Sequence, residues 1–266
     1  MTLSIRRDGP ITILSRDRRH ARNAMDPESA EELTRAFLAF EAEPSQAVAV
    51  LWGAGGAFCA GFDLKYAASL LGRADPLGDL AFPEGEGAVP RGPMGPTRLA
   101  LSKPVIAAIA GPAVAGGMEL ALWCDLRVME ESAYMGVYCR RWGVPLIDGG
   151  TVRLPRLVGR GRALDLVLTG RKVPAGECLR IGLCDRLVPD GQSLEAAIKL
   201  AHEIARSPQA CLRSDRAAIF RQEGLSEPDA LRAEWHHSAS VFEREGADGA
   251  RRFAEGKGRG GDFSNI

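Results

Sequence analysis

The stretch KPVIAAIAGPAVAGGMELALWCDLR, residues 103–127, organises the rest of this chain. Its apolar run at 105–109 predicts a short buried strand, and the glycines from Gly111 to Gly117 predict a turn that a ligand can approach closely. A helix is expected to open at Met118, and its first turn carries one carboxylate, Glu119, among apolar neighbours. Burying such a charge is costly unless it has a partner or a task. Glu119 is therefore a candidate functional residue.

A second stretch repeats this pattern, with the apolar run AVAVLW at 47–52 followed by the glycine-rich GAGGAFCAG at 53–61. Helix N-termini leave backbone N–H groups unpaired, and two such groups converging on one point make an oxyanion hole that can stabilise an enolate. The alternative is that both are ordinary turns between a strand and a helix. Neither turn is a phosphate loop, because Gly117 and Met118 stand where GxxxxGK[ST] requires Lys and Ser or Thr.

Strands and helices alternate as far as about residue 190, and helices alone follow, which predicts an α/β core with a helical C-terminal region. We place the boundary between residues 192 and 193. Gly and Pro are dense at 72–96 and predict a long binding loop or lid. Strands are expected at 2–6, 10–14, 47–52, 105–109, 126–129, 133–137 and 185–188. Helices are expected at 27–43, 64–71, 97–102, 153–158, 160–169, 174–181, 193–206, 208–222, 227–246 and 248–256, besides the one from Met118.

The composition indicates an ordinary globular protein, with 266 residues, 45% apolar residues and a formal net charge of zero. We therefore expect neither a nucleic-acid partner nor a membrane anchor. The start of the chain lacks the apolar segment of a signal peptide. Six cysteines without CxxC spacing indicate a reduced, cytoplasmic protein. We expect no metal site, because the one close pair of histidines, His236 and His237, is adjacent in a predicted helix.

Four segments, 53–65, 103–127, 143–171 and 175–189, resemble in this order the crotonase superfamily of enoyl-CoA hydratases and isomerases. The similarity covers nearly the whole chain. It implies an α/β fold, a spiral of ββα units at 1–192, and at 193–266 a helical region that builds homotrimers, often paired as hexamers. It also implies an acyl-CoA thioester substrate, a place in fatty acid metabolism, and no cofactor, because coenzyme A is part of the substrate.

The resemblance also assigns roles to single residues. The backbone amides of Ala60 and Gly116 match the oxyanion hole. Asn23 and Ala24 match a segment beside the CoA, and Arg22 is the candidate phosphate contact, although a solvated surface charge is the alternative for any single basic residue. The remaining candidates for contact with CoA or substrate are Ala60, Gly61, Phe62, Asp63, Leu64 and Lys257, with Lys65 more plausibly a surface charge.

Glu119 matches one of two glutamates that hydratases use as acid and base, and Cys139 occupies the place of the second. Asp148 is the candidate that compensates; the alternative is that it caps the helix near Thr151. Arg140 and Arg141 are its expected charge partners. Enoyl-CoA hydration with Glu119 is the first functional hypothesis. Isomerisation of an enoyl-CoA or dienoyl-CoA by Glu119 and Asp148, and a non-catalytic protein that binds CoA thioesters, are the alternatives.

Overall fold

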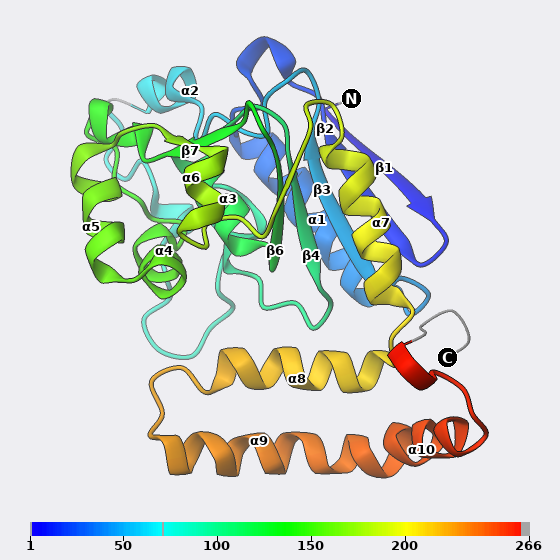
Figure 1. Ribbon diagram of the computed structural model, residues 1–266. Helices are drawn as coiled ribbons and strands as arrows, with labels where there is room; N and C mark the ends of the chain where they lie inside the picture. Colours follow the sequence, from blue (N-terminus) through cyan, green and yellow to red (C-terminus); the bar gives the residue numbers. More distant parts are fainter. Residues whose placement is uncertain (1, 71, 262–266) are drawn as a thin grey trace. The chain divides into compact units, whose positions relative to one another are not determined.

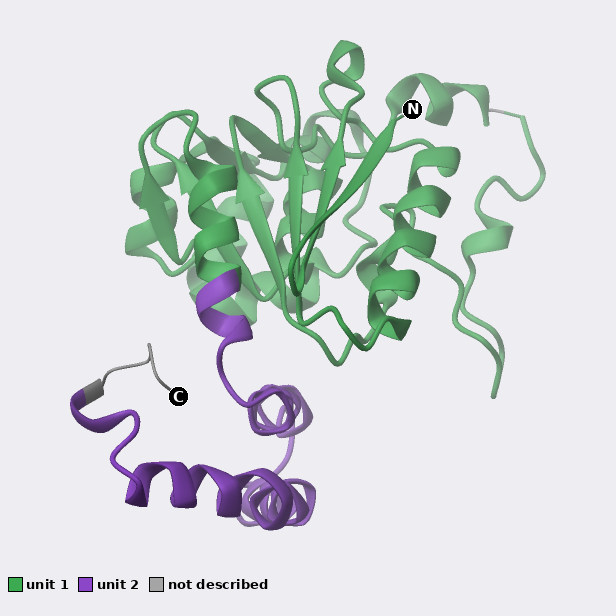
Figure 2. Cartoon of the chain, turned by 90° about the vertical axis from the view of Figure 1, so that its right-hand side faces the viewer, with its two compact units in different colours: residues 1–201 green, residues 202–266 purple. Residues whose placement is uncertain are grey.

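The computed structural model describes residues 2–70 and 72–261. The chain forms two compact units, residues 1–201 and 202–266, drawn in different colours in Figure 2. The units divide inside α7 (Ser193–Ala205), whereas the sequence places the boundary at the first residue of that helix.

A six-stranded sheet forms the centre of the first unit, in the order β1-β2-β3-β4-β6-β9 (Figure 1). The first two strands form an antiparallel hairpin, and every later neighbour in the sheet is parallel. All five residues of β4 are buried, as expected for a parallel strand covered on both faces. The six strands are β1 (Leu3–Asp8), β2 (Ile11–Arg16), β3 (Val48–Gly53), β4 (Val105–Ile109), β6 (Leu126–Glu130) and β9 (Arg186–Val188).

A second sheet has three short strands, β5 (Pro112–Val114), β7 (Tyr134–Gly136) and β8 (Val173–Pro174). The strand β5 lies inside the glycine-rich stretch where the sequence predicts only a turn. Each of β4 and β6 is followed by a short strand in this second sheet and then by helix, so the ββα unit expected from the sequence recurs. The sequence predicts β7, within 133–137, but not β5 or β8, each of which has at most three residues and contains a proline.

Among the described residues of the first unit, six α-helices lie wholly within it, and most of the predicted ones are confirmed. Asp26 caps α1 by accepting a hydrogen bond from the Ser29 N–H at 2.9 Å. Asp63 caps α2 in the same way, through Lys65 N–H at 3.0 Å. The helices are α1 (Pro27–Ala42), α2 (Leu64–Ser69), α3 (Gly116–Trp123), α4 (Gly150–Val158), α5 (Arg160–Thr169) and α6 (Ala175–Arg180).

The helix predicted at 97–102 is wrong, because only the 3₁₀ turn Pro96–Arg98 forms there. Tertiary hydrogen bonds hold the following residues extended. The Leu99 carbonyl accepts from the Trp123 indole at 3.0 Å, and the Ser102 N–H donates to Glu41 at 2.9 Å. In the Gly/Pro-rich segment before it, the described residues contain one 3₁₀ turn, Gly78–Leu80.

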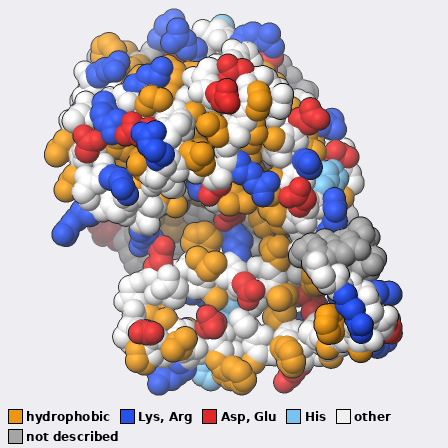
Figure 3. All heavy atoms as spheres, in the orientation of Figure 1, with side chains coloured by type: hydrophobic (Ala, Val, Ile, Leu, Met, Phe, Trp, Pro, Cys, Tyr) orange, Lys and Arg blue, Asp and Glu red, His pale blue; other side chains and the backbone are white. Residues whose placement is uncertain are grey.

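The second unit is helical. Ser214 and Ser238 join α8 to α9 through their hydroxyls at 3.0 Å, and Glu245 caps α8 by accepting from the N–H groups of Ala210 and Cys211. On the face shown in Figure 3, basic and acidic side chains are interspersed with hydrophobic ones. The helices are α8 (Gln209–Arg221), α9 (Glu227–Val241), a π-helical turn (Phe242–Gly246) and α10 (Ala247–Ala254).

Within residues 2–70 and 72–261, no helix is both long and apolar enough to cross a membrane. The same residues contain no cluster of His, Cys, Asp and Glu side chains suited to a metal ion. Five cysteines are buried and Cys211 is exposed.

Candidate active site

The two glycine-rich turns contact each other at the ends of β3 and β4. Cys59 N–H donates to the Pro112 carbonyl at 3.1 Å, and Val114 N–H donates to the Cys59 carbonyl at 3.0 Å. Gly61, with φ +97°, lies so close that a Cβ there would be 2.9 Å from the Ala115 Cβ and 3.0 Å from the Gly116 nitrogen. Glycine is therefore required at 61 for the two turns to approach this closely.

Ala115 has φ 54° and ψ −127°, a conformation that residues with a Cβ rarely adopt. It is the N-cap of α3, so the strained bend directs the chain straight into the first helical turn. In the described part of the chain the Gly116 N–H, at the start of this helix, has no hydrogen-bond partner. The N-terminus of α3 thus presents an unpaired amide beside Gly61.

At Ala60 the structure disagrees with the sequence interpretation. The Ala60 N–H already donates to the Arg22 carbonyl at 3.0 Å. Met25 and Phe62 form an isolated β-bridge. The Met25 N–H donates to the Gly61 carbonyl, and the Met25 carbonyl accepts from the Asp63 N–H, both at 2.8 Å. This bridge leaves out the Phe62 N–H, which makes no hydrogen bond within the described residues. Phe62, and not Ala60, has the available amide.

Glu119, in the first turn of α3, is 3% exposed. Its Oε1 accepts two backbone hydrogen bonds, from the Asp148 N–H at 2.9 Å and from the Gly150 N–H at 2.8 Å. Burial, and next the charge of Asp148, raise the pKa of Glu119 to about 7, although the two amides and Arg153 act in the opposite direction. A carboxyl group with this pKa can take up and release a proton near neutral pH.

Asp148 is 4% exposed, and burial raises the pKa of its carboxyl group. Its Oδ1 accepts from the Met94 N–H at 3.0 Å and from the Thr97 hydroxyl. The prediction that Asp148 caps α4 is wrong, because the N-cap is Gly149 and no side chain caps the helix.

The charges near Asp148 come from Arg98 and Arg153 rather than from the predicted pair. Arg140 Nε donates to the Val167 carbonyl, and Arg141 stacks on the Tyr138 ring. Sequence reasoning missed Arg98, which is 50 residues from Asp148 in the chain, and also Arg153, which lies with Asp148 in the segment 143–171 but has no role assigned by the resemblance.

Cys139 lies in the 3₁₀ turn Tyr138–Trp142 and is 6% exposed. Burial, and next the negative charge of Glu119, raise the pKa of its thiol. The thiol is therefore near Glu119 and neutral at pH 7. Met94 also lies at the site, because a Cβ on Gly116 would come within 2.5 Å of its sulfur.

The structure brings two of the predicted CoA-contact segments, 22–24 and 60–64, side by side, but several of their groups already have partners within the protein. Ala24 is buried, and Asn23 is committed to the carbonyls of Ala54 and Ala57. Asp63 pairs with Arg18 at 3.2 Å while it caps α2. Four of the predicted side chains are exposed: Arg22, Leu64, Lys65 and Lys257.

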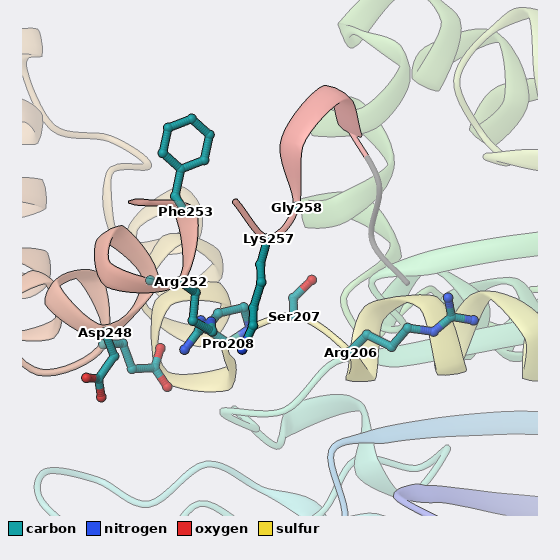
Figure 4. A pocket seen from close by; sticks show the side chains of 10 residues that line it. Arg206, Ser207, Pro208, Asp248, Arg252, Phe253, Lys257 and Gly258 are labelled. Carbon is teal, nitrogen blue, oxygen red and sulfur yellow. The ribbon is translucent and has the colours of Figure 1, made fainter. Parts of the chain in front are cut away.

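Lys257 belongs to the second unit, where it lines a cavity of about 640 Å³ together with Arg206 and Arg252 (Figure 4). Glu245 and Asp248 also line this cavity, so its charges are mixed. The roles of Lys257 and of the other predicted CoA contacts stay predictions.

Comparison with known proteins gives concordant results. A family model described as enoyl-CoA hydratase/isomerase matches residues 7–259. The chain is 35% identical over 259 residues to the enoyl-CoA hydratase EchA19 of Mycobacterium tuberculosis, covering 94% of this chain and 92% of the relative. It is 31% identical over 267 residues to a carnitinyl-CoA dehydratase of Salmonella arizonae, covering 96% and 95%.

Solved structures of enoyl-CoA hydratases also resemble this chain. The crystal structure of enoyl-CoA hydratase EchA1 from Mycobacterium marinum superposes with a TM-score of 0.84 at 30% identity, covering 96% of each chain. An enoyl-CoA hydratase from Bacillus anthracis superposes with a TM-score of 0.83, also at 30% identity and 96% of each chain.

Proposed function

The chain belongs to the enoyl-CoA hydratase/isomerase family, and from that premise we propose that it adds water across the 2,3-double bond of an enoyl-CoA thioester. The observation that carries the proposal is the position of Glu119, a buried carboxyl group with a pKa of about 7, in the first turn of the helix that begins with the unpaired Gly116 amide. The names of the relatives favour hydration over the isomerase alternative.

In the proposed reaction the N–H groups of Gly116 and Phe62 donate to the thioester oxygen and stabilise the enolate. Ionised Glu119 removes a proton from water while the water oxygen bonds to C3. The π electrons of the double bond move toward C2 and the thioester, and Glu119 then returns its proton to C2. One carboxyl group serves both transfers, because the neutral thiol of Cys139 does not replace a second glutamate.

We also propose that the protein is a homotrimer, either alone or paired as a hexamer, with the second unit contributing the interface. Large side chains of this unit support the proposal, since Ile219, Trp235 and Phe242 are 65%, 70% and 73% exposed. Light scattering on the purified protein measures the mass. The same proposal places the protein in the cytoplasm, where its six thiols stay reduced.

The hydratase proposal is tested by the loss of absorbance of the conjugated enoyl thioester of crotonyl-CoA. Glu119→Gln keeps the size and the acceptor oxygen of the side chain but removes its ability to carry a proton, so kcat should fall by about 10²- to 10⁴-fold. Glu131→Gln, at an exposed position after β6, is the control that removes one carboxylate elsewhere.

Two outcomes would contradict the proposal in different ways. If the Glu119→Gln protein turns over as fast as the wild type, the role of Glu119 is wrong. If the wild type binds CoA esters but converts no enoyl-CoA, the non-catalytic hypothesis replaces hydration.

A further inference from the structure

The carboxylate of Asp148 is enclosed by a different part of the chain from the one that holds Glu119. Its Oδ1 receives the Met94 N–H and the Thr97 hydroxyl, both from the segment that ends the Gly/Pro-rich loop. A Cβ on Gly92 would collide with this oxygen and with the Thr97 hydroxyl. This oxygen is therefore already occupied by two protein donors and closely packed by Gly92.

Arg153, on the first turns of α4, ties the same two segments together through their backbones. Its Nη1 donates to the Asp148 carbonyl at 2.8 Å, and its Nη2 donates to the Thr97 carbonyl at 2.7 Å. Residue 148 is thus fixed to residue 97 twice, once by its own side chain and once by this guanidinium group.

The backbone that these contacts fix is the backbone that holds the proton carrier. Glu119 Oε1 receives the N–H groups of Asp148 and Gly150. A Cβ on Gly150 would lie 2.9 Å from the Glu119 Cγ and from its Oε1, so the loop also packs directly on this side chain. A shift of residues 148–150 would move the carboxylate.

Resting on the hydratase function proposed above, we propose that Asp148 and Arg153 are positioning residues. They fasten residues 148–150 to the Met94–Thr97 segment, so that two backbone amides hold the Glu119 carboxylate, and Asp148 places its own carboxyl group beside it. Asp148 itself exchanges no proton with the substrate.

The charge of Asp148 has a measurable consequence. The charged groups that face Glu119 include Asp148 and Arg153, with the Cys139 thiol nearby, and those that face Asp148 include Glu119, Arg98 and Arg153. The Asp148 charge raises the pKa of Glu119. Removing that charge while keeping the hydrogen bonds should therefore lower the pKa of Glu119.

Asp148→Asn makes this change, because the amide oxygen can still accept from the Met94 N–H and the Thr97 hydroxyl. The acidic limb of the kcat/KM profile for crotonyl-CoA should move to lower pH, with the plateau rate within about threefold of wild type. Glu131→Gln again serves as the control and should leave the limb in place. If Asp148 carried a proton to or from the substrate, Asp148→Asn would abolish turnover at every pH, and the proposal would be overturned.

Arg153→Met tests the positioning and is assayed at pH 9, because the variant also loses a positive charge that lowers the pKa of Glu119. Losing both bonds to the carbonyls should lower kcat by about 10- to 100-fold through misplacement of Glu119, with little change in KM, and Arg153→Lys should restore part of the rate. An unchanged kcat in Arg153→Met would contradict the role of the guanidinium group. Where a variant folds poorly, Thr97→Val removes one hydrogen bond to Asp148 and should give a smaller loss in kcat.

The protonation of Glu119 can also be followed without turnover, by ¹³C NMR of protein labelled at the glutamate Cδ, with Glu119→Gln to assign the signal. The titration midpoint should fall in Asp148→Asn and stay in place in Glu131→Gln. If the wild type hydrates no enoyl-CoA but this midpoint falls, the proposed function fails while the electrostatic coupling stands. An unmoved midpoint overturns the coupling whatever the activity.

Discussion

The two glycine-rich turns have similar sequences but produce an unpaired amide in different ways. After β4, the strained Ala115 leads directly into α3, and the free donor is the N–H of the first helical residue, Gly116. After β3, the chain first pairs with Met25, and the free donor is the N–H of Phe62, which this bridge leaves out. A helix terminus makes one donor and an interrupted bridge makes the other.

This difference explains why the sequence identifies one donor and not the other. The position of the free Gly116 amide is set by residues next to it in the sequence, because the end of the strand and the start of the helix fix it. The free Phe62 amide depends on residues 37 to 40 positions earlier, since Arg22 occupies the Ala60 amide and Met25 pairs on both sides of Phe62.

The largest expected effect comes from replacing single backbone amides by esters, which removes one N–H and leaves the side chain unchanged. An ester at Phe62 or at Gly116 should lower kcat for crotonyl-CoA by about 10²- to 10³-fold, as for the loss of one oxyanion donor. An ester at Ala60 removes only the bond to Arg22 and should affect stability more than kcat. The reverse order, with Ala60 more sensitive than Phe62, would restore the original assignment.

A smaller effect is expected from Gly61→Ala, which separates the two turns. The new Cβ would lie 2.9 Å from the Ala115 Cβ, so one turn must shift, and we expect kcat/KM to fall by about 10- to 100-fold. Gly56→Ala is the matched control, because it also has a positive φ but no atom within 4 Å of the added Cβ. It should cost about 1 kcal/mol of stability without a comparable loss of activity.

The pH dependence distinguishes the turns further, because the helix after the second turn carries Glu119. Since hydration starts with ionised Glu119 and its pKa is raised to about 7, kcat/KM should fall about tenfold per pH unit below pH 7. Rates of crotonyl-CoA hydration between pH 5 and 9 measure this limb. An acidic limb with an apparent pKa near 4.5, the ordinary value for glutamate, would mean that burial does not raise the pKa of Glu119.

The smallest effect is expected from Cys139→Ala, which changes the residue near Glu119. Because its thiol is neutral at pH 7, losing it should leave kcat within about threefold and cost about 1 kcal/mol of unfolding free energy through the small cavity. Steady-state rates and urea unfolding measure both quantities. A hundredfold loss in kcat would instead assign a direct role to the thiol.

Much of the fold follows from local sequence signals. Asp26-Pro27 sets the start of α1, and the apolar runs locate β3 and β4. Glu119 is also identified locally, because a carboxylate among apolar residues is conspicuous. The surroundings of Asp148 cannot be predicted from local signals. The sequence marks Asp148 as a candidate, but its contacts with Met94 and Thr97 join segments about 50 residues apart.

The unpaired amides of Phe62 and Gly116 have a consequence for hydrogen exchange. A backbone amide without an acceptor lacks the protection that hydrogen bonding gives its neighbours. In the free protein these two protons should exchange with deuterated solvent faster than the Ala60 proton, which Arg22 protects. A bound thioester oxygen would supply the missing acceptor, so occupancy of the site could be read from the exchange rates of two backbone protons, without following any reaction.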